Sequence, residues 1–165
     1  ALAVDTRFSA NIEEAQAAGI KVGVYIFSQA ITAQEAEEEA AFVLSLVSGC
    51  DLDLPLVLDY EFDESHAGRL ATAELSTEER TAIVLAFCDY VTKEGFSPMV
   101  YGNAHMLENN LQAAEIGEKA AIWYANYNDT TLTKSYALWQ YTESGTVAGI
   151  SGNVDCDFAF TALHR

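Results

Sequence analysis

LPLVLDYEF, residues 54–62, is a nearly continuous apolar run that ends in acidic and aromatic side chains. A run of this length with no polar face predicts a strand that is covered on both sides, as the strands of parallel sheets are. IKVGVYIF, residues 20–27, has the same character. Further strands are predicted for SPMVYGN at 97–103, AAIWYANY at 120–127 and YALWQYT at 136–142.

Helix signals alternate with these strands. Ser9 is a candidate N-cap for a helix over residues 9–19, and a short polar helix is predicted over 103–112. Capping boxes open two longer helices, one at Thr32 and Glu35 and one at Ser76 and Glu79. The alternation indicates a parallel α/β sheet. Because acidic residues stand at strand ends, it favours a TIM-like β/α barrel that forms one domain, residues 1–165.

Composition excludes several classes of protein. The 165 residues contain 8 Lys and Arg against 25 Asp and Glu, and the net charge of −17 argues against a nucleic-acid partner. No apolar run approaches the roughly 18 residues of a membrane span, so no membrane partner is expected. The three cysteines form no C-x-x-C pair and are expected to be buried apolar residues. The histidines lack metal-binding spacing, and the sequence predicts neither a metal nor a cofactor.

The acidic excess is expected on solvated helix faces rather than in a site. This expectation applies to Glu13, Glu14, Glu37, Glu38, Glu39, Glu78 and Glu79.

Asp59 and Glu61 are the strongest candidates for chemistry. Side chains alternate along a strand, so these two carboxylates share one face, roughly 7 Å apart. The active sites of β/α barrels lie at the C-terminal ends of their strands, which is where these two residues are predicted to stand. Apolar neighbours such as Leu58, together with mutual repulsion, raise a carboxyl pKa and suit an acid that holds a proton near neutrality. The alternative is a solvated strand end without a catalytic role.

Aromatic and amide side chains recur at the predicted strand ends. Flat rings beside hydrogen-bonding groups suit a carbohydrate cleft, because sugar rings present apolar faces edged with hydroxyls. Asp155 is a further acid at a strand end near the C-terminus. Core packing is the alternative for the aromatic residues, above all for Trp139. The candidate cleft residues are Tyr25, Tyr101, Asn103, Trp123, Tyr127, Trp139 and Gln140.

Together, GIKVGVYIFSQAIT, LPLVLDYEF, GFSPMVYGN, IWYANY and LWQYTESGTVAGISGNVD resemble the glycoside hydrolase family 25 lysozymes from about Asp5 onward. The resemblance implies a modified β/α barrel that hydrolyses the β-1,4 bond between N-acetylmuramic acid and N-acetylglucosamine of peptidoglycan. It implies that Glu61 is the general acid, that Asp59 assists it, that Asp155 lines the same site and that the aromatic residues shape the sugar cleft. It also implies an extracellular or cell-wall location, for a secreted or phage-encoded protein.

One departure from the resemblance leads to further expectations. The family begins with a strand bearing a D-V-S-type motif, then a helix and a second strand, and none of these precedes Ala1. An N-terminally truncated barrel is therefore expected, with residues 20–27 as an exposed edge that favours a homo-oligomer. The alternative function is a weakly active or inactive fragment that binds cell-wall glycan. A chitinase-like hydrolase is a third possibility, against which the LWQY and G-x-V-D segments argue.

Overall fold

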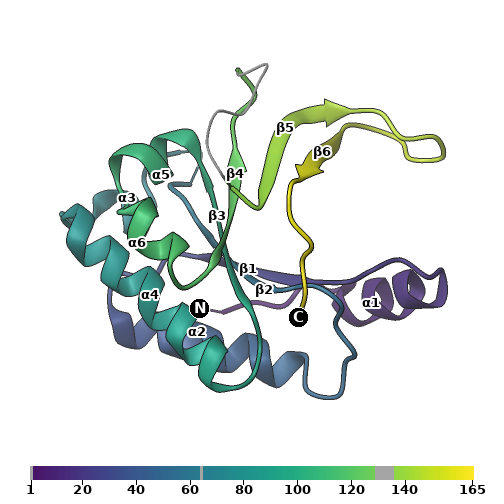
Figure 1. The fold of residues 1–165 in the computed structure, drawn as a ribbon, viewed down its shortest axis with the longest axis horizontal. Coiled ribbons are helices and arrows are strands. Elements are labelled where there is room, and N and C mark those ends of the chain that lie inside the picture. Colours follow the sequence, from purple (N-terminus) through teal and green to yellow (C-terminus); the bar gives the residue numbers. More distant parts are fainter. Residues whose placement is uncertain (1, 64, 129–135) are drawn as a thin grey trace.

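A computed structural model describes residues 2–63, 65–128 and 136–165 of the chain (Figure 1). Its strands are β1 (Val24–Ser28), β2 (Leu56–Tyr60), β3 (Pro98–Asn103), β4 (Ala121–Ala125), β5 (Leu138–Gly145) and β6 (Val154–Ala159). Its helices are α1 (Phe8–Ala17), α2 (Ala33–Leu46), α3 (Arg69–Thr72), α4 (Thr77–Lys93), α5 (Ala104–Asn109) and α6 (Ala113–Gly117).

The described strands form one six-stranded sheet in the order of the sequence, β1 to β6. Neighbours from β1 to β5 are parallel, whereas β6 runs antiparallel to β5. The sheet curls so that β5 and β6 lie across an open space from β1 in Figure 1, and β1 and β6 do not pair among the described residues. The predicted α/β, TIM-like class is confirmed, and the described strands form an open arc of it.

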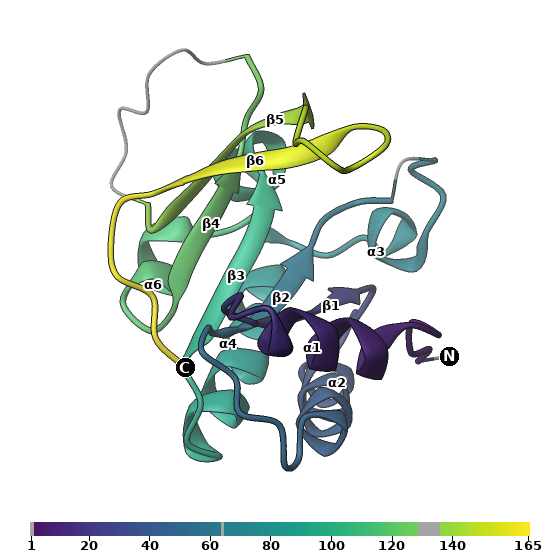
Figure 2. The same cartoon turned by 90° about the vertical axis from the view of Figure 1, so that its right-hand side faces the viewer.

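Alternation along the strands divides the sheet into two faces. On β2, Leu56, Leu58 and Tyr60 are fully buried in the core beneath the helices. Helix α2 packs on β1 and on α4, and α4 covers β2 and β3 (Figure 2). The intervening residues of β2, Val57 and Asp59, point to the opposite, concave face. The strand predicted from its apolar run is therefore covered on the helix side and carries an acid on the other.

Both predicted caps begin helices where they were expected, but only the second forms a complete capping box, because the Glu35 side chain accepts the Ile31 N–H rather than that of Thr32. The Thr32 hydroxyl accepts a hydrogen bond from the Glu35 backbone N–H at 3.2 Å, and Ser76 and Glu79 form a complete capping box before α4. The prediction for Ser9 is wrong. Ser9 lies inside α1, whose N-cap position is Arg7 and has no side-chain cap.

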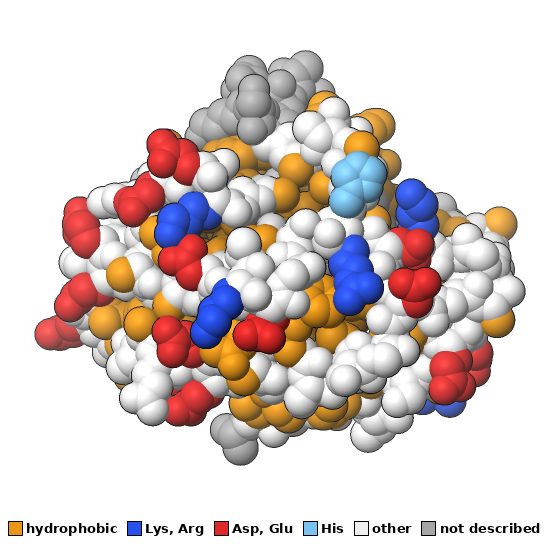
Figure 3. All heavy atoms as spheres, turned by 60° about the horizontal axis from the view of Figure 1, so that its bottom comes forward, with side chains coloured by type: hydrophobic (Ala, Val, Ile, Leu, Met, Phe, Trp, Pro, Cys, Tyr) orange, Lys and Arg blue, Asp and Glu red, His pale blue; other side chains and the backbone are white. Residues whose placement is uncertain are grey.

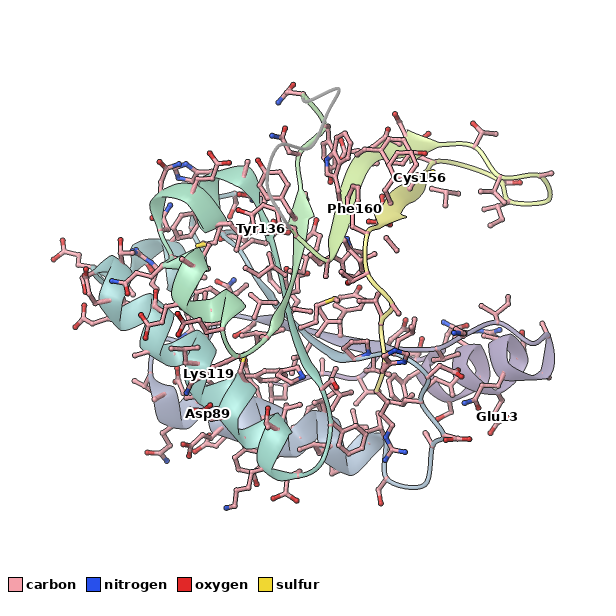
Figure 4. All side chains as sticks on the ribbon, viewed as in Figure 1. Glu13, Asp89, Lys119, Tyr136, Cys156 and Phe160 are labelled. Atoms are coloured by element: carbon pink, nitrogen blue, oxygen red, sulfur yellow. The ribbon has the colours of Figure 1, made fainter. Side chains whose placement is uncertain are left out.

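On the face that Figure 3 shows, acidic side chains lie at separate points, with Lys and Arg between some of them. Lys119 and Asp89, for example, form an ion pair at 2.8 Å on the helix side (Figure 4). Glu39 is an exception, and the expectation of a solvated side chain is wrong for it. It is only 8% exposed because α2 turns it toward the sheet, and burial raises the pKa of its carboxyl.

The cysteines are all free thiols. Cys88 is buried as expected, whereas Cys50 and Cys156 are half-buried. Within the described parts of the chain, no helix is long and apolar enough to cross a membrane.

Strand β1 is an edge among the described residues, and its concave face is open. Tyr25 is 66% exposed and Phe27 is 46% exposed. Large aromatic side chains on an unpaired edge strand are the feature expected from the sequence of residues 20–27.

Candidate active site

One row of side chains crosses the concave face of the sheet. Residues in register on parallel neighbours point to the same side, so the pairing places a ring, an acid and two further rings side by side. The row consists of Phe27 on β1, Asp59 on β2, Tyr101 on β3 and Trp123 on β4.

Asp59 is the acid at the centre of this row. Its Oδ1 atom is buried and has no hydrogen-bond partner among the described residues. Burial raises the pKa of its carboxyl from 3.8 to about 7, and the Glu61 charge adds to the rise. With burial as the larger cause and the Glu61 charge as the smaller one, the Asp59 carboxyl retains its proton up to about neutral pH.

Glu61 directly follows β2 and is held from two directions. Its Oε2 atom accepts a hydrogen bond from Asn103 Nδ2 at 2.9 Å. The Asn103 amide cannot be reversed without loss, because its Oδ1 accepts the Met106 N–H at 2.9 Å and caps α5. The Glu61 carbonyl accepts a hydrogen bond from Gln29 Nε2 at 3.1 Å.

Sequence reasoning missed Gln29. Its Oε1 atom accepts the Leu70 N–H at 3.2 Å, so the side chain ties the end of β1 to α3 and to the chain beside Glu61. No local pattern identifies this role, because Leu70 lies 41 residues away in the sequence.

Gln140 accepts hydrogen bonds from two tyrosines of the concave face. It is 4% exposed, and its Oε1 accepts hydrogen bonds from Tyr101 Oη at 2.7 Å and Tyr127 Oη at 3.2 Å. Burial, with the Glu61 charge second, raises the pKa of the Tyr101 phenol, which therefore stays protonated and acts as a donor. The structure thus brings Tyr101, Tyr127 and Gln140 together as predicted for one cleft.

Trp123 stands next to Tyr101 with the two rings nearly perpendicular, at 81° and 5.2 Å between centroids. Its indole N–H donates to Asp157 Oδ1 at 2.6 Å. Asp157 was not predicted, although alternation on β6 places it on the same face as the predicted Asp155. Asp155 is exposed. Burial raises the pKa of both Asp157 and Tyr127, and the Asp155 charge adds to each rise.

Two predicted cleft residues lie elsewhere. Trp139 is 6% exposed in the core, where its N–H donates to the Asn126 carbonyl at 2.9 Å. Its register partner is Tyr124, on the face opposite Gln140. Tyr25 is on the concave face, but it pairs with Val57, one pleat below Asp59.

A groove of about 1050 Å³ lies beside β1 and is lined by Tyr25, Phe27, Gln29, Asp63 and Arg69 among others. Asp59 and Glu61 are absent from its lining. The carboxylate pair and its hydrogen-bonded neighbours, rather than this groove, have the geometry of a reactive centre. No group of three or more metal-binding side chains converges within residues 2–63, 65–128 and 136–165.

The family model for "Glycosyl hydrolases family 25" matches residues 2–150. The chain belongs to glycoside hydrolase family 25.

Two curated relatives are lysozymes by name. The family 25 chain is 28% identical over 155 residues to the autolytic lysozyme of Clostridium acetobutylicum, covering 93% of this chain and 44% of that protein. It is 29% identical over 160 residues to lysozyme M1 of Streptomyces globisporus, and the match covers 92% of this chain and 53% of that protein. The chain therefore spans about half the length of these relatives.

Two solved structures share the fold. The modular autolysin LytC from Streptococcus pneumoniae superimposes with a TM-score of 0.81 at 26% identity, covering 94% of this chain and 37% of that one. The CTP1L endolysin superimposes with a TM-score of 0.75 at 30% identity, and the match covers 96% of this chain and 54% of the endolysin chain.

Proposed function

We propose that this family 25 chain is the catalytic part of a peptidoglycan hydrolase, a muramidase that cleaves between N-acetylmuramic acid and N-acetylglucosamine. The observation that carries the proposal is that Asp59 and Glu61 stand two residues apart at the end of β2, where burial and the Glu61 charge raise the pKa of Asp59 to about 7. Tyr101, Asn103 and Trp123 surround this pair with donors and aromatic surface. Two interacting carboxyls that keep one proton up to about neutral pH can supply the proton that a leaving glycosidic oxygen requires.

In the proposed mechanism Glu61 is the general acid that protonates the leaving oxygen. Both carboxylates come from one strand end and lie on the same side of it, which does not suit the usual arrangement of two carboxylates that flank the scissile bond. An acetamido group of the substrate can instead act as the nucleophile, with its carbonyl oxygen attacking the anomeric carbon. Asp59 then accepts a hydrogen bond from the acetamido N–H and orients it, and Asp155 lines the same site.

The names of relatives support the substrate and the location. LytC has also been solved in complex with a synthetic peptidoglycan ligand, and that structure superimposes with a TM-score of 0.80 at 26% identity over 93% of this chain and 37% of that one. We propose peptidoglycan strands as the partner of this chain too, at the cell wall, for a secreted or phage-encoded protein.

Product analysis tests the proposal. Purified peptidoglycan is incubated with the chain, and the first-formed anomer at the new reducing end is observed by NMR. New N-acetylmuramic acid reducing ends with retained β configuration are expected, because attack by the acetamido group and then by water inverts the centre twice. Inversion would exclude the acetamido mechanism, and N-acetylglucosamine reducing ends would exclude a muramidase.

A second candidate function is glycan binding without effective turnover. The row of aromatic and amide side chains favours it, because these groups can bind sugar rings whether or not the acids complete a reaction. Sedimentation of the chain with insoluble peptidoglycan, without release of reducing ends, would distinguish binding alone from hydrolysis.

A further inference from the structure

Asp157 makes the shortest hydrogen bond to an aromatic side chain of the site, and no role has been assigned to it. Trp123 Nε1 donates to its Oδ1 at 2.6 Å. The contact joins β4 to β6 across the intervening strand β5, where Gln140 is the register partner of Asp157. A hydrogen bond to a carboxylate is shorter and roughly twice as strong as one between neutral groups.

This contact adds a second restraint to an indole that already packs against a neighbouring ring. Trp123 is half-buried, with part of its ring open to the concave face. The Tyr101 ring contacts it at nearly a right angle, and Tyr101 is itself held by Gln140. With its N–H fixed by Asp157, the indole is left with a single orientation.

We propose that Asp157 is a positioning residue of the glycan-binding face, which holds the Trp123 indole as a fixed wall against the ring of a bound sugar. The inference rests on the proposed function, and it adds a residue that acts through Trp123 without taking part in the reaction. An aromatic platform fixed before binding loses less conformational entropy when a ligand arrives.

The charges around Asp157 make the contact sensitive to pH. Partial burial raises the pKa of its carboxyl, the Trp123 hydrogen bond opposes the rise and the Asp155 charge adds to it. Tyr141 on β5 is the other titratable group that interacts with it, and its phenol stays neutral because its own pKa is raised, chiefly by its hydrogen bond with Cys156. As pH falls through the raised pKa of Asp157, the carboxylate gains a proton and becomes a weaker acceptor for the indole.

The two tryptophans provide an internal comparison in an NMR experiment. The Trp123 indole N–H signal is expected to titrate with a midpoint above that of an ordinary aspartate, and the titration is expected to disappear in Asp157→Asn. The Trp139 indole N–H donates to the neutral Asn126 carbonyl and is expected to stay unchanged. In Asp155→Asn, the Trp123 signal is expected to keep titrating, with a lower midpoint.

Binding of soluble peptidoglycan fragments tests whether the Asp157 contact with Trp123 strengthens glycan binding. It is measured in a Glu61→Gln background that prevents cleavage. Asp157→Leu, which has no acceptor, is expected to weaken binding about tenfold, whereas Asp157→Asn stays close to the parent. In a Trp123→Phe background, Asp157→Leu is expected to cause no further loss.

The binding results distinguish failure of the inference from failure of the proposed function. Parent-like binding by Asp157→Leu, or an equal loss with and without the Trp123 indole, would overturn the inference and leave the proposed function standing. A parent chain that binds no glycan would overturn both. An Asp157→Leu variant whose Trp139 signal moves has altered packing, and the Asp157→Asn titration then decides the inference alone.

Discussion

At the scale of single residues, Asp59 links the proposed chemistry to the stability of the fold. Its pKa rises from 3.8 to about 7 on folding, chiefly through burial. The folded chain therefore binds this proton more tightly than the unfolded chain. It follows that Asp59 costs no stability below about pH 4, and that a cost develops as pH rises toward 7 and is complete above it.

Asp59→Asn is predicted to stabilise the protein at pH 8 by as much as about 4 kcal/mol, because the amide cannot ionise. The gain is expected to vanish near pH 4, where both side chains are neutral. Urea unfolding of parent and variant across this pH range measures it, and a variant that is no more stable than the parent at pH 8 would contradict the raised pKa. The same substitution is expected to abolish hydrolysis.

The rule of alternation predicted which residues share a face but not which strands lie in register. Asp59 and Glu61 could be placed together because they are two apart on one strand. Phe27 could not be placed beside Asp59, because the register between β1 and β2 is not readable from either segment alone. The adjacent residues Trp139 and Gln140 were both predicted for the cleft, although neighbours on a strand point to opposite faces.

At the scale of helices and strands, the caps are predicted to act where a side chain accepts a backbone N–H. Ser76→Ala is expected to lower the free energy of unfolding by about 1 kcal/mol, because it removes the cap from α4. Ser9→Ala is the matched control, since Ser9 lies within α1 and caps nothing. Urea unfolding measures both, and equal losses would contradict the assignment of the caps.

Elements with strong local signals were predictable, and short ones were not. The longer helices carry capping boxes and apolar stripes, and the strands carry apolar runs. Helices α3 and α6 have 4 and 5 residues, too few for a periodic pattern to develop. The short helix predicted over 103–112 is α5, which ends at Asn109.

At the scale of the whole molecule, the open edge at β1 and the net charge act in opposite directions. The exposed Tyr25 and Phe27 favour self-association, and a charge of −17 opposes it. Salt screens charges over about 8 Å at physiological ionic strength and less at higher salt. We therefore predict that the chain associates at high concentration, and more strongly as salt is raised.

Tyr25→Glu is expected to weaken this association in sedimentation velocity experiments. Ile150→Glu adds the same charge at an exposed residue that precedes β6 and is expected to have a smaller effect. A parent that remains a 17.9 kDa monomer at high concentration and high salt would contradict the prediction. Equal effects of the two substitutions would show that β1 is not the contact.

The order of the strands, and hence the site at their C-terminal ends, was predictable because strands and helices alternate through most of the chain. The antiparallel pairing of β6 with β5 was not predicted, because no helix separates them and either direction fits an apolar run. That pairing places Asp157 against Trp123 and so completes one side of the candidate site.

The most direct test of the central claim is clearing of a peptidoglycan suspension by the parent, by Glu61→Gln and by Glu13→Gln. Glu13 carries the same group on α1, where it is exposed and outside the candidate site (Figure 4). We predict clearing by the parent and by Glu13→Gln, and its loss in Glu61→Gln, by at least about a hundredfold for removal of a general acid. Equal clearing by all three proteins would contradict the assignment of Glu61 as the acid of a muramidase.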